Sequence, residues 1–118
     1  MKTRLSASGF DLTAELEKYA MRKIAQLSRQ VPRGHRSRAE CQIYFEQVRR
    51  KGKKINTCTV GLMLDGEVLK TEEATLHMYT SLDIAMVHIE RQLIDYAAQQ
   101  RKHPVRERLR RFWRSDWM

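Results

Sequence analysis

The side chains best suited to chemistry in this 118-residue sequence are its lysines and arginines, and that chemistry is the binding of phosphate. The chain holds 23 Lys and Arg residues against 14 Asp and Glu residues, which gives a formal net charge of +9 at pH 7. Such a balance attracts polyanions, meaning nucleic acid, anionic lipid or an acidic protein. The charge therefore indicates a binding surface.

The positive charge is concentrated in two segments. Residues 22–54 contain eleven basic and two acidic residues, and residues 101–114 contain seven basic and one acidic residue. Residues 55–100 hold seven acids and only two bases, so one part of the folded molecule should be strongly positive and serve as a docking face. The candidate RNA-binding residues in the two segments are Arg22, Lys23, Arg29, Arg33, Arg36, Arg50, Lys51, Lys53, Arg101 and Lys102. Each of them taken singly also fits an ordinary solvated surface, whereas the whole set favours phosphate contacts.

Residue types that could support catalysis or bind a metal are present, but their spacing suits neither. The four histidines are His35, His77, His88 and His103. They lack metal-ligand spacing, and no glycine-rich phosphate loop, nucleophile elbow or HExxH motif occurs. Cys41 and Cys58 lie in strand-like segments, where we expect two reduced and buried side chains that could approach each other across a hairpin. We therefore expect no enzymatic activity, no cofactor and no metal.

Alternation of apolar and polar residues predicts four strands. They cover Lys2–Ser8, Ala39–Val48, Ile55–Leu64 and about Glu67–Glu73, and the pattern does not fix the inward register of the last one. Between the second and third strands, Arg49–Lys54 is expected to form a turn with five positive charges. Asp65-Gly66 predicts a tight hairpin before the fourth strand.

Helical spacing of apolar residues predicts two helices. The first is capped by Asp11 or Thr13 and ends near residue 29, and the second runs from about Met78 to Gln100. The resulting order, β-α-β-β-β-α, favours an α+β fold in which a four-stranded sheet carries both helices on one face. We expect this domain to span residues 1–103. No apolar run is long enough to cross a membrane, and a cytosolic location is expected.

Residues 104–118 are expected to form a basic tail. Its arginines alternate with aromatic residues, among them Phe112, Trp113 and Trp117. Such rings can stack on unpaired bases, and arginine planes can do the same. The alternatives are that the two tryptophans fold back on the domain or contact a membrane interface.

The helices also carry motifs of a known family. The first reads Leu12-Thr13-x-x-Leu16-x-x-Tyr19-x-x-x-Lys23-x-x-x-Leu27, and the second carries Met78-Tyr79-x-x-x-Asp83 and then Glu90-Arg91-Gln92-Leu93. With the Asp65-Gly66-Glu67-Val68 hairpin between them, the chain resembles the ribosome hibernation promoting factor and ribosome-associated inhibitor family, also called sigma-54 modulation proteins. The resemblance covers about residues 2–103.

The resemblance implies a double-stranded-RNA-binding-domain-like fold and a partner, the small ribosomal subunit. Members occupy the channel of messenger RNA and tRNA and block translation in resting cells. Carried over by position, Lys23 and Arg91 would be rRNA contacts. The family's second helix usually continues with a dense basic run, whereas this chain has Ile94-Asp95-Tyr96-Ala97. We expect a short-form protein that is monomeric off the ribosome.

Two other functions share parts of this evidence. A general double-stranded RNA-binding protein would have the same charge and topology. A protein or membrane interaction module would act through the basic, aromatic segment Arg106–Trp117.

Overall fold

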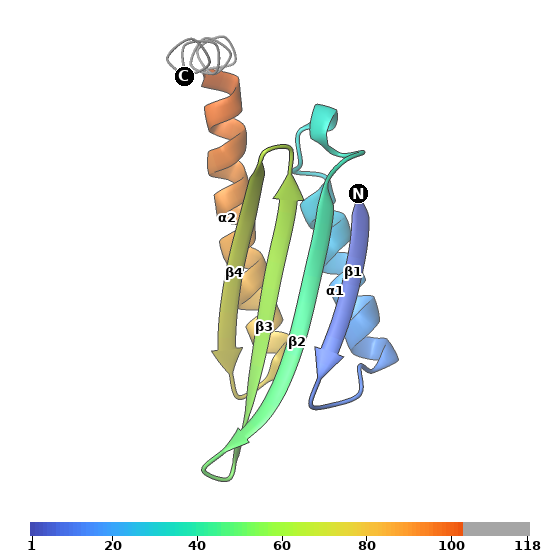
Figure 1. Ribbon diagram of the computed structural model, residues 1–118, viewed down its shortest axis with the longest axis vertical. Helices are drawn as coiled ribbons and strands as arrows, with labels where there is room; N and C mark the ends of the chain where they lie inside the picture. Colours follow the sequence, from blue (N-terminus) through green and yellow to red (C-terminus); the bar gives the residue numbers. More distant parts are fainter. Residues whose placement is uncertain (103–118) are drawn as a thin grey trace, which may run out of the picture.

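The computed structural model describes residues 1–102, and the predicted tail, residues 104–118, lies outside them. The elements in chain order are β1 (Lys2–Ser8), α1 (Ala14–Ser28), the short 3-10 helix η1 (Arg33–His35), β2 (Glu40–Arg50), β3 (Lys53–Leu64), β4 (Glu67–Thr75) and α2 (Met78–Lys102). Both long helices lie on the same face of the sheet (Figure 1). The predicted α+β class and the β-α-β-β-β-α order are confirmed.

The four strands form one mixed sheet in the order β1-β2-β3-β4. β1 pairs with β2 in parallel, and the two remaining pairs are antiparallel hairpins. A parallel pair needs a crossover connection, which α1 provides, whereas hairpins need only short turns. β1 lies at one edge of the sheet and β4 lies at the other.

The core lies between the sheet and the two helices. α1 contributes Leu16, Ala20, Ile24 and Leu27, which are spaced so that they share one helix face. The largest fully buried side chains include Phe45, Leu27, Ile43, Leu62, Leu82, Met86, Ile89 and Leu93. Every second residue of β2 and β3 faces this core, and the residues between them face away from the helices.

Cys41 and Cys58 are both buried on the core side of the sheet, as predicted. Cys41 pairs with Leu62, which is four positions from Cys58 along β3, so the two cysteines are offset by roughly 13 Å along the strands. This register does not bring the two thiols within disulfide reach. Burial raises the pKa of each thiol to about 12.

The ends of the elements correct several predicted boundaries. Thr13, not Asp11, caps α1, because the backbone N–H of Leu16 donates a hydrogen bond to Thr13 Oγ1 at 3.1 Å. β4 continues to Thr75 and turns Leu69, Thr71, Glu73 and Thr75 toward the helices. α2 begins at Met78 as predicted and continues to Lys102, two residues beyond the predicted end.

The largest correction concerns the β2–β3 hairpin. The predicted turn over residues 49–54 is wrong, because pairing continues without a bulge to Arg50↔Lys53. Only Lys51 and Gly52 form the turn, with φ of 52° and 78°. Two successive residues with positive φ are typical of a type I′ turn, whose twist matches that of the flanking strands.

Candidate nucleic-acid interface

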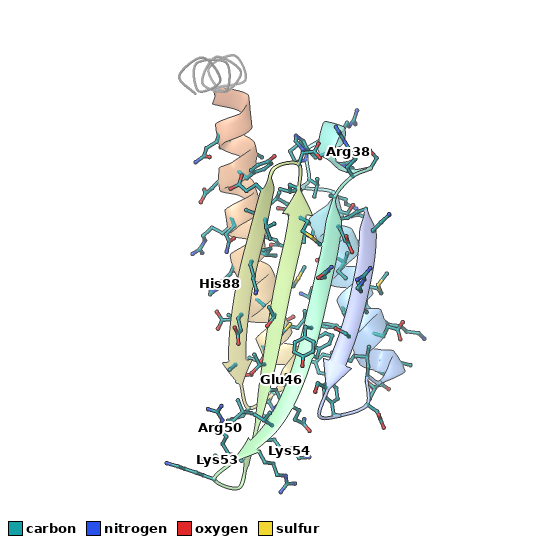
Figure 2. The ribbon with its side chains drawn as sticks, viewed as in Figure 1. Arg38, Glu46, Arg50, Lys53, Lys54 and His88 are labelled. Atoms are coloured by element: carbon teal, nitrogen blue, oxygen red, sulfur yellow. The ribbon has the colours of Figure 1, made fainter. Side chains whose placement is uncertain are left out.

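The extended β2–β3 hairpin carries the densest positive charge in the described part of the chain. The five basic residues in and next to its turn, which we call the cationic finger, are Arg49, Arg50, Lys51, Lys53 and Lys54. All five are exposed, and none of them has an ion pair among residues 1–102. The hairpin projects past the ends of the neighbouring strands and helices (Figure 1), and Arg50, Lys53 and Lys54 lie at its tip (Figure 2).

Strand register places the cations of the finger against one another. Arg49 is opposite Lys54, and Arg50 is opposite Lys53. Like charges directly opposite each other on a sheet destabilise it, so the hairpin forms here at a cost that backbone pairing must offset. A bound polyanion would remove this repulsion, which is why the arrangement suits a phosphate-rich partner.

A second basic cluster lies in the connection from α1 to β2, at the opposite end of the molecule. Arg38 marks this end in Figure 2, and the ten residues of rise along β2 place it about 33 Å from the finger. Two of its arginines have internal partners. Arg36 donates to the backbone oxygens of Val31 at 2.9 Å and Arg29 at 2.7 Å, and Arg38 lies 3.1 Å from an Asp65 carboxylate oxygen.

The side chains of Arg29 and Arg33 in this second cluster stay exposed, with no ion pair among the described residues. Arg36 by contrast closes the loop that follows α1, since one guanidinium holds two backbone carbonyls. Its charge remains, but its geometry is fixed by the fold. Arg29 and Arg33 are therefore the members of this cluster that are freest to reach a phosphate.

The predicted residues on the two long helices differ in their surroundings. Arg22 on α1 and Arg91 on α2 are exposed. Lys23 is half-buried, with its Nζ 3.4 Å from Oδ1 of Asp83 and 5.3 Å from the centroid of the Tyr19 ring. Partial burial lowers the pKa of Lys23, but the Asp83 carboxylate and the Tyr19 hydroxyl raise it more, so the net shift is upward.

The structure therefore does not gather the predicted site residues in one place. Arg50, Lys51 and Lys53 lie in the finger, and Arg29, Arg33 and Arg36 at the other end. Arg101 and Lys102 fall in the last turn of α2, and their side chains are outside the described ones. The basic residues of positions 29–54 lie at both ends of β2, and Arg22 and Lys23 on α1 and Arg91 on α2 lie on the helices.

Sequence reasoning missed two members of the finger, Arg49 and Lys54. Both belong to the basic run that gave the other three, and strand pairing puts all five on one projection. Within residues 1–102, no group of three His, Cys, Asp or Glu side chains could hold a metal ion. No described helix is long and apolar enough to span a membrane.

The fold recurs in solved structures of ribosomal subunit interface proteins and their relatives. The N-terminal domain of Protein Y from Thermus thermophilus superposes with a TM-score of 0.68 at 18% identity, covering 81% of this chain and 99% of that one. A ribosomal subunit interface protein from Coxiella burnetii gives a TM-score of 0.66 at 22% identity, covering 83% of this chain and 99% of that one. No curated protein sequence matches the chain.

At these low identities the structural matches show the fold alone, and family membership comes from the sequence. A family model described as Sigma 54 modulation protein / S30EA ribosomal protein matches residues 3–101. The chain belongs to this family, which confirms the resemblance seen in the two helices. It is a family of ribosome-associated proteins and not a known family of enzymes.

Proposed function

We propose that this protein is a ribosome-associated translation inhibitor, a hibernation factor that binds rRNA of the small subunit in the channel used by messenger RNA and tRNA. The observation that carries the proposal is the cationic finger, whose five charges project from the fold without internal ion pairs among the described residues. Family membership supplies the ribosome as the partner. A cytoplasmic location goes with this partner.

The proposed mechanism is occupancy and not catalysis. Each cation that neutralises a phosphate releases a counterion, so affinity comes from many contacts without base recognition. The finger and the loop that carries Arg29 and Arg33 lie at opposite ends of β2, which is about 33 Å long, so the domain can contact two separate stretches of rRNA. Held at both ends, the folded domain excludes messenger RNA and tRNA from the space it fills.

The proposed rRNA contacts include the finger, Arg22, Arg29, Arg33 and Arg91. Lys23 and Arg36 belong to the same proposal, but each already has an internal partner, so we expect smaller contributions from them. This ranking is testable residue by residue. The sharpest comparison is between the finger and cations that lie elsewhere.

Co-sedimentation with ribosomes in sucrose gradients tests the proposal. The wild-type protein should run with small subunits and monosomes at moderate salt, and Lys53→Gln with Lys54→Gln should lose much of this association. The matched control, Lys2→Gln with Lys18→Gln, removes the same charge from exposed positions outside the finger. Equal losses in both variants, or a wild-type protein that stays at the top of the gradient, would reject the proposal.

Competition distinguishes the proposal from general double-stranded RNA binding. A free RNA duplex that displaces the protein from ribosomes at equal salt and equal phosphate concentration would favour the general binder. An interaction module acting through residues 104–118 makes a different prediction. Deleting these residues would abolish binding in that case, whereas the proposed function requires the association to persist.

A further inference from the structure

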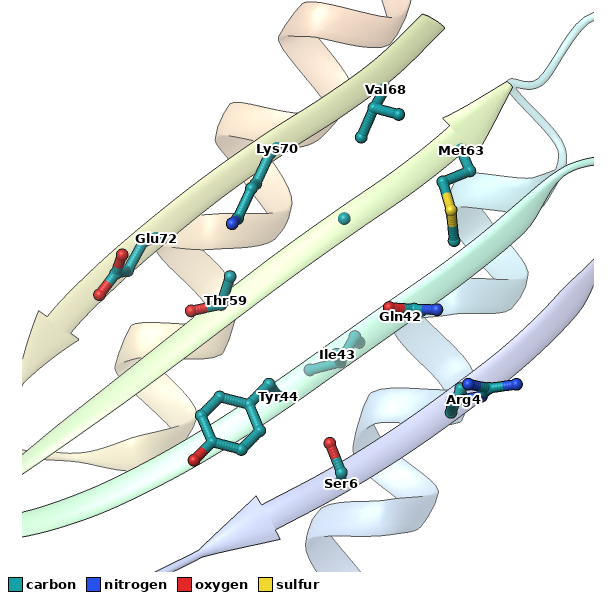
Figure 3. Close-up of a pocket in the computed structure, with 11 residues that line it drawn as sticks. Arg4, Ser6, Gln42, Ile43, Tyr44, Thr59, Met63, Val68, Lys70 and Glu72 are labelled. Carbon is teal, nitrogen blue, oxygen red and sulfur yellow. The ribbon is translucent and has the colours of Figure 1, made fainter. Parts of the chain in front are cut away.

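The sheet face turned away from the helices contains a shallow hollow of about 460 Å³ (Figure 3). One cross-strand row runs through it from Arg4 on β1 to Gln42, Gly61 and Lys70 on β4. Gly61 lines the hollow and has no side chain, in a row to which each of the other three strands contributes a long one. The hollow falls in the size range of small-ligand sites.

Backbone geometry does not require glycine at position 61. Gly61 lacks the positive φ of Gly9, Gly52 and Gly66, and an added Cβ would meet no atom within 4 Å. Glycine in a strand interior weakens the strand, because it packs nothing and costs more conformational entropy. A ligand that approaches the sheet backbone closely at this position would explain why the chain has glycine here in spite of the lost stability.

An exposed aromatic ring stands beside the hollow. Tyr44 on the central strand β2 is 38% exposed, and its hydroxyl donates to Oε2 of Glu46 at 3.2 Å. The apolar side chains of Met63 and Val68 line the same hollow, and Val68 is 63% exposed. An aromatic ring with apolar neighbours on an open sheet is the kind of platform on which unpaired bases stack.

Charged side chains of both signs surround the hollow. Arg4 and Lys70 flank it from the two edge strands and Glu72 lines it, while Glu40 and Glu46 lie on the same face of β2. The positive charge that would attract a nucleotide phosphate is therefore at the two edges of the sheet and at the finger. Arg4 approaches Glu40 only at 3.9 Å and is well exposed. The same face continues without a change of register to the Arg50↔Lys53 pair, so it is continuous with the finger.

We propose that this open sheet face binds an unpaired segment of ribosomal RNA, with one base in the hollow over Gly61 against Tyr44. Phosphates of the segment lie toward Arg4 and Lys70 and, further along, toward the finger. This inference rests on the proposed function for its partner and adds a base-stacking site to it. A duplex does not fit, because paired bases present no free ring face to a sheet.

The test uses the full chain and a short fluorescein-labelled oligouridylate, with binding followed by fluorescence anisotropy. Tyr44→Ala should weaken binding by about 5- to 150-fold, the range expected for one stacked base. Tyr44→Phe should keep most of the affinity. Gly61→Val should weaken binding while raising the melting temperature, because it fills the hollow and favours the strand.

The control is Thr57→Val, which places the same valine side chain on the same face of β3 outside the hollow. It should leave binding unchanged. The inference is overturned if wild-type protein does not bind the oligonucleotide, if Gly61→Val and Thr57→Val bind alike, or if an RNA duplex competes as well as a single strand.

Ribosome co-sedimentation separates this inference from the function on which it rests. Tyr44→Ala leaves every cation of the finger in place, so it should still run with ribosomes at low salt. Retained sedimentation with unchanged oligonucleotide binding would reject the stacking site alone. A wild-type protein that binds the oligonucleotide but never the ribosome would instead reject the proposed function.

Discussion

Lys23 on α1 and Asp83 on α2 form an ion pair that joins the two long helices, with 3.4 Å between Nζ and Oδ1. The Tyr19 hydroxyl donates to the same carboxylate oxygen at 2.5 Å, and the Tyr19 and Tyr79 rings pack edge to face with centroids 5.1 Å apart. These four residues belong to the helix motifs that carried the family resemblance. Their convergence gives the motif a structural role in addition to any contact with RNA.

Replacing Asp83 by Ala should lower the free energy of unfolding by about 1 kcal/mol, because it removes a hydrogen bond and a partly exposed ion pair at once. Urea denaturation followed by circular dichroism measures the change. Glu90→Ala is the matched control, since Glu90 is another α2 carboxylate and has no ion pair among the described residues. Equal stability of the two variants would show that the contacts of Asp83 do not stabilise the packing of α1 against α2.

Lys23→Ala separates the structural role of Lys23 from its predicted contact with rRNA. A lost phosphate contact lowers the slope of log affinity against log salt by roughly 0.9 per duplex phosphate, whereas a purely structural residue leaves this slope unchanged. We expect Lys53→Ala, in the finger, to lower the slope by the full amount and Lys23→Ala to lower it by less. Ribosome binding measured over a salt series gives both values. A larger effect of Lys23 would reverse the proposed ranking.

The contacts of Tyr19 and Lys23 with Asp83, which we call the helix junction, should also make the stability of the fold depend on pH in the alkaline range. The hydrogen bond to Asp83 and partial burial raise the pKa of Tyr19 above its ordinary 10.0, and the pKa of Lys23 is raised above 10.5. Both folded pKa values exceed the unfolded ones, so the folded state binds protons more tightly. This contribution is fully present below pH 10 and is lost as pH rises through the folded pKa values.

Urea denaturation at a series of pH values from neutral to alkaline checks this dependence. The wild-type free energy of unfolding should fall above pH 10 more steeply than that of Asp83→Asn. The neutral amide of asparagine lacks the negative charge by which the Asp83 carboxylate raises the pKa of Tyr19 and Lys23. Curves of equal steepness would show that the junction does not set the alkaline limit. Asp83→Asn keeps the shape of the side chain, so differences in packing are small.

The order of elements was predictable because it depends on local alternation and helical spacing, which β2, β3 and both helices show clearly. The register of β4 was not, because polar residues occupy its core-facing positions. Oε1 of Glu73 lies 3.0 Å from Nδ1 of His88, and the hydroxyl oxygens of Thr75 and Ser81 lie 2.7 Å apart. Contacts to α2 thus satisfy groups that an alternation pattern assigns to solvent.

The candidate site was less predictable than the fold. Residue types indicated a polyanion partner, but sequence alone did not show that β2 divides the basic run between two ends of the sheet. The partner of Lys23 is distant in sequence, and the hollow over Gly61 depends on the register of all four strands. Such relationships arise from tertiary pairing, which local periodicity does not encode.

The two cysteines should be inert in the folded protein. Burial raises the pKa of both thiols to about 12, so they stay protonated at pH 8, and the thiolate is the reactive form. Ellman's reagent should therefore react slowly at pH 8 and react at once with both thiols after unfolding in guanidinium. Rapid labelling of the native protein would contradict the burial of Cys41 and Cys58.

Geometry and charge at the finger can be separated at its turn. Gly52 has a φ of 78° with open space around its Cβ position, so Gly52→Ala keeps every charge but strains the backbone, at a cost of about 1 kcal/mol. Lys51→Asn instead keeps the turn, because asparagine tolerates positive φ, and removes one charge. Gly52→Ala should lower the melting temperature and leave the salt slope of ribosome binding unchanged. Lys51→Asn should lower the slope with little effect on melting, and the opposite pattern would show that turn conformation, not charge, governs binding by the finger.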